Sequence, residues 1–131
     1  MTLFQKIIDR EIPAKIVYED DDVLAFLDIS QQTPGHTLVI PKKATASVLT
    51  APEETIAVVN IQAAKIAKSL IDALGASGAN LLSNAGEVAG QTVFHYHVHI
   101  IPRYEEDELK LDIKEHSSTI DEVYETIKEV F

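Results

Sequence analysis

Three of the chain's five histidines fall at alternate positions, in the run His95-Tyr96-His97-Val98-His99-Ile100-Ile101. The residues between and after them are Tyr, Val and Ile, which favour β-strands. Successive side chains of a strand point to opposite faces, so residues two apart share a face and lie about 6.5 Å apart. The pattern predicts a strand from about Val93 to Ile101, ended by Pro102, with three imidazoles along one face.

Hydrophobic periodicity along the rest of the chain predicts an α+β fold. The short connections between the first strands favour an antiparallel meander, and we expect the helices to cover one face of the sheet. Capping boxes are predicted where Thr precedes Gln or Glu by three residues, at Thr2, Thr50 and Thr119. The predicted elements are a short helix from Thr2, strands at 16–19, 23–28 and 36–40, a long helix from Thr50 to Gly75, strands at 80–84 and 93–101, and a last helix after Thr119.

Composition limits the classes of partner. The net charge of −10 opposes binding to nucleic acids and to anionic membranes, and Lys42-Lys43 is the one candidate basic patch. No apolar run approaches the length of a membrane span, and no N-terminal signal is present. The absence of cysteine excludes disulfides and Cys-type zinc sites and fits a reducing compartment. We therefore expect a cytoplasmic protein with no membrane or nucleic-acid partner.

The histidine row admits three chemical interpretations. A purely structural role would require several buried imidazole nitrogens to find hydrogen-bond partners. A metal site would use two alternate histidines, but most such sites add a carboxylate or a further histidine, and the nearest acids follow Pro102. In the third interpretation a neutral imidazole attacks phosphorus, and neighbouring histidines move the protons.

The loop before the row suits the third interpretation. Gly86 and Gly90 allow backbone N–H groups to approach an anion, and Gln91 and Thr92 add side-chain donors. An ordinary turn would have the same composition, so the loop alone does not decide between metal binding and phosphorus chemistry.

The run from His95 to Ile101 resembles the His-φ-His-φ-His-φ-φ signature of the histidine triad (HIT) superfamily, where φ is apolar. Further segments resemble family blocks in family order: Leu3–Ile8, Glu11–Lys15, Ala25–Ile29, Pro34–Lys42 and Asn84–Phe94. The compact bacterial members of the purine nucleoside phosphoramidase branch are the most similar. The resemblance implies a single HIT domain over residues 1–131, with a core at about 3–103 and an acidic link and helix at 104–131.

The resemblance also implies catalytic roles for four histidines. His97 corresponds to the nucleophile that attacks the α-phosphorus of a nucleotide and forms a nucleotidyl-histidine intermediate. His99 corresponds to a histidine that binds phosphate and can protonate the leaving group. His95 and His36 correspond to supporting positions that orient the site and share protons.

The implied substrate is a purine nucleotide derivative. An acid at the position of Asp28 binds the ribose hydroxyls in the family, and apolar positions enclose the base, which gains from aromatic walls. Gln91 and Thr92 match family positions that contact the phosphate or the leaving group, and Asn84 matches a polar position near the phosphate. The apolar set comprises Phe4, Ile7, Phe26, Ile29 and Leu38.

One departure from the family concerns zinc. Many bacterial members bind a structural zinc, and three of its four ligand positions here hold Thr2, Gln5 and Ala44. We therefore expect no structural zinc and no other cofactor.

The resemblance implies a homodimer that hydrolyses purine nucleoside 5′-phosphoramidates or related phosphate derivatives. A dinucleoside polyphosphate hydrolase, a nucleotide-binding sensor or adaptor, and a metal-dependent enzyme using the histidine row remain alternatives.

Overall fold

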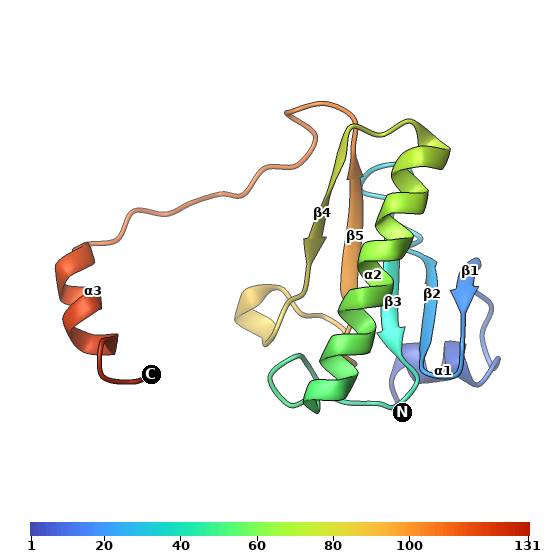
Figure 1. Ribbon diagram of the computed structural model, residues 1–131, viewed down its shortest axis with the longest axis horizontal. Helices are drawn as coiled ribbons and strands as arrows, with labels where there is room; N and C mark the ends of the chain where they lie inside the picture. Colours follow the sequence, from blue (N-terminus) through green and yellow to red (C-terminus); the bar gives the residue numbers. More distant parts are fainter.

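The computed structural model describes residues 1–131 and contains a five-stranded antiparallel sheet in the order β1-β2-β3-β5-β4 (Figure 1). The α+β class, the antiparallel sheet and the three helices are predicted correctly from the sequence. The elements are α1 (Leu3–Ile8), β1 (Ile16–Glu19), β2 (Val23–Leu27), β3 (Thr37–Pro41), α2 (Glu53–Leu74), β4 (Gly78–Leu82), the 3₁₀ turn η1 (Glu87–Ala89), β5 (Val98–Arg103) and α3 (Ile120–Ile127).

The two faces of the sheet are covered by different helices. On one face α2 packs Val59, Ala63 and Ile66 against alternate residues of β2, β3 and β5. On the other face α1 packs Phe4 and Ile7 against the intervening residues of β2 and β3. The expectation that the helices share one face is therefore wrong, because alternate strand residues are apolar on both faces. The second face is where the candidate site forms.

The helix ends follow local hydrogen bonding. The predicted capping box at Thr119 is formed with Glu122. Thr2 also caps α1, but the Gln5 side chain donates to Asp9 instead of returning to the cap. The predicted box at Thr50 is absent, because the Thr50 hydroxyl bonds to Ser47 and Thr45, and α2 begins after Pro52. Gly75 ends α2 in the left-handed conformation, as its position predicts.

The histidine strand is shorter than predicted, because β5 begins only at Val98. The backbone groups before it bond to loops and side chains instead of to a neighbouring strand. Tyr96 N–H donates to Thr45 O at 2.7 Å, and Ser83 Oγ donates to His97 O at 2.7 Å. The strand also runs through Pro102 and pairs with β4 as far as Arg103. His95 and His97 therefore lie on the segment entering β5, and only His99 lies on the strand.

The C-terminal segment extends away from the sheet (Figure 1). Every residue from 110 to 131 is exposed, including the apolar side chains of α3. None of the helices combines the length and the apolar character needed to cross a membrane.

Candidate active site

A pocket of about 790 Å³ opens on the α1 face of the sheet and is bounded mainly by apolar side chains. Leu38 on β3 is paired with both Phe26 on β2 and His99 on β5, so these side chains share that face. His97 and His99 bound the pocket, and β2 brings Asp28 to its edge. Eight further residues from four segments complete most of its wall: Phe4, Ile7, Ile12, Pro13, Phe26, Leu38, Thr92 and Val93.

The rings in this pocket contact one another edge to face. The Phe4 ring lies 5.4 Å from that of Phe26 and 5.0 Å from that of His97, between centroids. The His97 and His99 rings are 4.9 Å apart. Of the residues expected to enclose a base, Phe4, Ile7, Phe26 and Leu38 are buried in the wall, whereas Ile29 is fully exposed at the rim. An apolar chamber therefore adjoins two imidazoles.

The hydrogen bonds of His97 determine which of its nitrogens carries the proton. His97 Nδ1 lies 2.7 Å from His95 O, and a carbonyl oxygen only accepts. The neutral ring therefore holds its hydrogen on Nδ1 and leaves the Nε2 lone pair free. A free lone pair on a neutral imidazole is the form that can act as a nucleophile.

His95 is fully buried behind His97 and uses both ring nitrogens within the chain. Its Nε2 donates to Pro41 O at 2.9 Å, so its Nδ1 accepts from the Thr2 hydroxyl at 3.3 Å. This contact also bears on the structural zinc site that the resemblance implies for many bacterial HIT proteins. The Thr2 hydroxyl is hydrogen-bonded to His95 Nδ1, so this nitrogen is not free to bind zinc. Gln5 and Ala44, at two further ligand positions, have no thiolate or imidazole. These residues do not fit a structural zinc.

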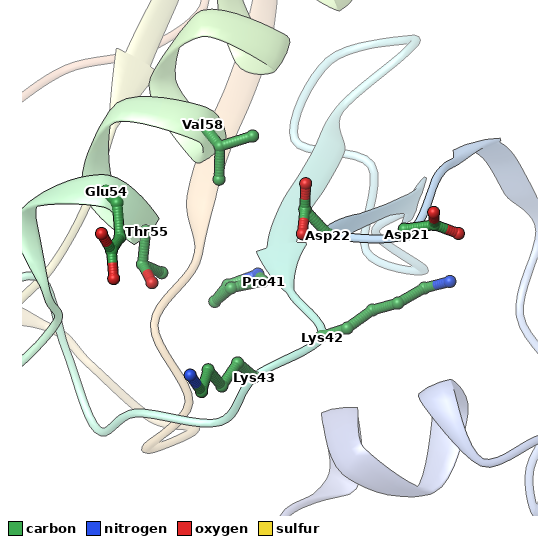
Figure 2. A pocket seen from close by; sticks show the side chains of 8 residues that line it. All are labelled: Asp21, Asp22, Pro41, Lys42, Lys43, Glu54, Thr55 and Val58. Carbon is green, nitrogen blue, oxygen red and sulfur yellow. The ribbon is translucent and has the colours of Figure 1, made fainter.

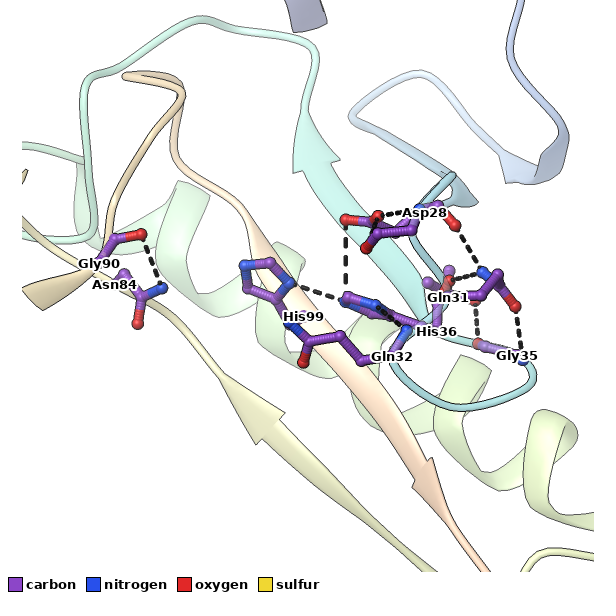
Figure 3. Close-up of polar contacts among 10 residues, drawn as sticks. Asp28, Gln31, Gln32, Gly35, His36, Asn84, Gly90 and His99 are labelled. Carbon is purple, nitrogen blue, oxygen red and sulfur yellow. Dashed lines mark hydrogen bonds and ion pairs between the residues drawn. The ribbon is translucent and has the colours of Figure 1, made fainter. Parts of the chain in front are cut away.

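His36, Asp28 and His99 form a connected group beside the pocket (Figure 3). His36 Nδ1 accepts from Gln32 N–H at 3.3 Å, so the hydrogen of neutral His36 lies on Nε2. That Nε2 lies 2.9 Å from His99 Nδ1 and 3.9 Å from Asp28 Oδ2. His99 Nδ1 is then the acceptor, and His99 carries its own hydrogen on Nε2.

Burial keeps the imidazoles neutral. Desolvation lowers the pKa values of His36, His95 and His97 below the usual range. For His99, desolvation and then the repulsion that His97 and His36 would exert if protonated lower the pKa to about 4, although the Asp28 carboxylate opposes this shift. The acid behaves differently. Burial raises the pKa of Asp28, but hydrogen bonds from Ser30 and the nearby imidazoles outweigh it, so Asp28 remains ionised at neutral pH.

Of the three polar residues expected near the phosphate or the leaving group, only Thr92 lines the pocket, and Asn84 and Gln91 do not. Gln91 is buried, donates to Ala46 O and Val93 O, and accepts from Gly86 N–H, so it has no free donor for a phosphate. Asn84 donates to Gly90 O at 3.4 Å, on the far side of His99 from Asp28 (Figure 3). In this conformation the Gln91 side chain therefore holds the loop, and its contact with the phosphate or the leaving group stays a prediction.

The Lys42-Lys43 pair borders a second, smaller cavity of about 340 Å³ (Figure 2). The β1–β2 turn contributes Asp21 and Asp22 to its wall, and α2 contributes Glu54. Lys42 also pairs with Glu19 at 2.8 Å. An anion in this cavity would face three carboxylates, so the two lysines do not form the basic patch considered from the sequence.

One set of side chains could bring three ligand atoms to a cation. The ligand atoms of Asp28, His36 and His99 all lie within 4.8 Å of one another. A metal would need the lone pair of His36 Nε2, and the ring proton would then move to Nδ1 and oppose Gln32 N–H. The hydrogen bonds therefore favour proton transfer over metal binding at this position.

Sequence and structure comparisons identify the family. The family model described as HIT domain matches residues 9–106. The chain belongs to the HIT family. It is 53% identical to the protein hit of Bacillus subtilis over 102 residues, which are 78% of this chain and 70% of that one. The crystal structure of a HIT family protein from Bacillus anthracis superposes with a TM-score of 0.87 at 44% identity, covering 98% of this chain and 93% of that one. Adenylylsulfatase HINT3 of Arabidopsis thaliana is 38% identical over 121 residues, covering 91% of this chain and 61% of that protein.

The sequence-based prediction missed the contribution of the β2–β3 turn. Gln31 and Gln32 lie between the predicted strands at 23–28 and 36–40 and were given no role, yet both hydrogen-bond to His36. Apart from two adjacent glutamines before the Pro34-Gly35 turn, the sequence carries no signal for these contacts, because they depend on how the turn closes.

Proposed function

We propose that this HIT protein hydrolyses purine nucleoside 5′-phosphoramidates, or related nucleoside phosphate derivatives, to nucleoside monophosphates. Its membership of the family supports a nucleotide hydrolase in general. The observation that carries the finer proposal is the hydrogen bond from His97 Nδ1 to His95 O, which leaves Nε2 as a free nucleophile at the end of an apolar pocket.

The first chemical step forms a bond between His97 Nε2 and the α-phosphorus. The bond from phosphorus to the leaving group breaks, and the leaving group takes its electron pair and the proton from His99 Nε2. The nucleotidyl-imidazole then carries positive charge, which the hydrogen bond from its Nδ1 to His95 O stabilises. His99, which has lost its only ring hydrogen, is left as an imidazolate that accepts the hydrogen bond from His36 Nε2 and lies beside the cationic His97 ring, and it becomes the base for the second step.

Water completes the cycle. His99 accepts a proton from the water molecule as its oxygen attacks phosphorus, and the bond to His97 Nε2 breaks. The products are a nucleoside monophosphate and the original neutral imidazoles. No metal is needed to balance the charges or protons in either step.

The nucleoside part of the substrate is held by groups of two kinds. The rings of Phe4 and Phe26, with Leu38 between the strands, provide an apolar surface for a purine. Asp28 is held at the pocket edge by Ser30, whose N–H and hydroxyl both donate to Oδ1. This leaves Asp28 Oδ2 to accept from ribose hydroxyls.

Other substrates fit the same first step. The name of the Arabidopsis relative, adenylylsulfatase, supports adenylyl sulfate as a second candidate, whose sulfate would leave in place of an amine. Dinucleoside polyphosphates are a third candidate. A sensor or adaptor would keep the pocket without needing the tautomer arrangement of His97 and His99.

We also propose that two copies of the chain form a homodimer. The outer edge of β4 has no partner strand, and Leu81 and Leu82 on it are exposed. The α3 helix likewise exposes Ile120, Val123 and Ile127. A second copy that covers these apolar groups would bury them from water. Light scattering at micromolar concentration should give twice the chain mass, and a monomer mass would remove this part of the proposal.

Turnover of an adenosine phosphoramidate with a fluorescent amine tests the proposed function. The wild-type protein should release the amine, and His97→Asn should reduce the rate by at least about a hundredfold, as expected when a nucleophile is lost. His116→Asn in the exposed C-terminal segment is the matched control and should keep the full rate. Equal rates for His97→Asn and the wild type would exclude the mechanism.

A further inference from the structure

The β2–β3 turn, which carries Asp28 and leads to His36, is held by one side chain that has no part in the chemistry above. The Gln31 amide donates to Asp28 O at 2.6 Å and to His36 O at 2.7 Å. Its oxygen accepts from Gly35 N–H at 2.9 Å. Figure 3 shows these bonds crossing the turn between its two ends. Gln31 therefore links the strand end that carries Asp28 to the start of β3.

The backbone of Gln31 is also unusual. Its φ is +44°, and only one other non-glycine residue, Arg10, has a positive φ. A side chain in this region destabilises the backbone, and such residues persist where the surrounding contacts fix them. Here the three amide hydrogen bonds supply those contacts. The conformation turns the next peptide so that Gln32 N–H reaches His36 Nδ1 at 3.3 Å.

The contact at His36 continues to the pocket. Because Gln32 N–H occupies His36 Nδ1, the His36 hydrogen lies on Nε2 and is directed to His99 Nδ1, 2.9 Å away. His99 Nδ1 then cannot carry a hydrogen, so the proton of neutral His99 is on Nε2. We propose that Gln31 is a positioning residue that holds His99 in this tautomer through Gln32 and His36, and thereby suits the site to leaving groups that need a proton.

This inference rests on the proposed function and gives it a leaving-group preference. An amine departing from phosphorus is strongly basic and requires a proton, whereas p-nitrophenolate is weakly basic and leaves readily without one. A loss of the His99 Nε2 proton donor therefore slows the first kind of substrate much more than the second. General damage to the pocket would slow both substrates alike.

The experiment compares Gln31→Met with the wild type on two substrates, an adenosine phosphoramidate of an alkyl amine and the p-nitrophenyl ester of AMP. Methionine keeps the side-chain length and removes all three hydrogen bonds. We expect kcat for the amine substrate to fall by about tenfold, a fraction of the roughly 100-fold or greater effect of a general acid, and kcat for the ester to change by less than about threefold. Gln62→Met on α2, away from the pocket, is the matched control and should leave both rates unchanged.

Nitrogen-15 NMR of the histidine rings tests the tautomer without any turnover. In the wild type the His99 signals should report a hydrogen on Nε2 only, and in Gln31→Met they should report a mixture of the two tautomers. Gln31→Gly should give the same change, because glycine accepts the positive φ but also lacks the amide. An unchanged His99 tautomer in both variants, or an equal loss of kcat on both substrates, would overturn the inference. A wild-type protein that turns over neither substrate would refute the proposed function, whereas the NMR result would still decide the role of Gln31.

Discussion

Acidification of the medium tests the electrostatic description of the site. His99 is surrounded by apolar groups and two other imidazoles, and its pKa is lowered to about 4. An unperturbed histidine has a pKa of about 6.5 and would be only about one tenth neutral at pH 5.5. With a pKa of about 4, His99 is more than nine tenths neutral at that pH. The two cases therefore differ by about tenfold in the active fraction of the protein at pH 5.5.

The sign of the effect follows from the direction of the shift. A lowered pKa means that the neutral form, which the mechanism uses in the free protein, survives to lower pH. We expect kcat/KM to stay nearly constant from pH 7.5 to 5.5 and to fall as the pH approaches 4. The profile reports pKa values that belong to the coupled imidazoles together, so its midpoint is not assigned to one ring.

The assay is the initial rate of amine release at low substrate concentration, measured in buffers of constant ionic strength. Circular dichroism at each pH serves as the control for unfolding, because the unfolded chain binds protons to its histidines below about pH 6.5 and the folded state loses stability from there down to about pH 4. A midpoint at pH 6.5 or above, with the fold intact, would refute the conclusion that burial keeps these imidazoles neutral.

Three further substitutions have separate expected results. Asp28→Asn should raise KM for a ribonucleoside substrate by about tenfold, because the carboxylate is proposed to accept hydrogen bonds from the ribose hydroxyls. KM for the 2′,3′-dideoxy analogue should stay nearly unchanged, and equal increases for both substrates would contradict this role. Tyr96→Phe should lower the free energy of unfolding in urea by about 1 kcal/mol, because the buried Tyr96 hydroxyl accepts a 3.0 Å hydrogen bond from the Asn60 amide that the variant lacks. Thr2→Ala should also lower it by about 1 kcal/mol, because the hydroxyl caps α1 and donates to His95; no change would show that neither bond contributes.

The fold is predictable from the sequence to the extent that local patterns determine it. The apolar spacing in α2 and the stop at Gly75 identify the long helix, and β1 has the predicted bounds of Ile16–Glu19. The start of β5 is not predictable in this way. Alternation favours a strand from Val93 onward. In the structure, however, Tyr96 N–H donates to the Thr45 carbonyl and the Ser83 hydroxyl donates to the His97 carbonyl, so these backbone groups do not pair with a neighbouring strand. These partners are distant in sequence.

The site shows the same division. The spacing of His97 and His99 predicts that they share a face, and their rings do lie side by side. The orientation of Gln91 is not encoded locally, because its three hydrogen bonds are made to the loop itself and to Ala46. Nor does the sequence reveal the tautomers, which depend on the His95 carbonyl and on Gln32 N–H. Residue type and spacing indicate which chemistry is possible, and the tertiary hydrogen bonds determine which nitrogen performs it.

Mass spectrometry of an acid-free, rapidly quenched reaction tests the central claim most directly. The protein is mixed with an adenosine phosphoramidate, denatured within milliseconds and digested at neutral to alkaline pH, where a phosphoramidate bond to histidine survives. The mechanism predicts an added adenylyl group on the peptide that contains His95, His97 and His99, located by fragmentation on His97. An adduct on another residue, or single-turnover release of AMP with no adduct at any time, would contradict nucleophilic attack by His97.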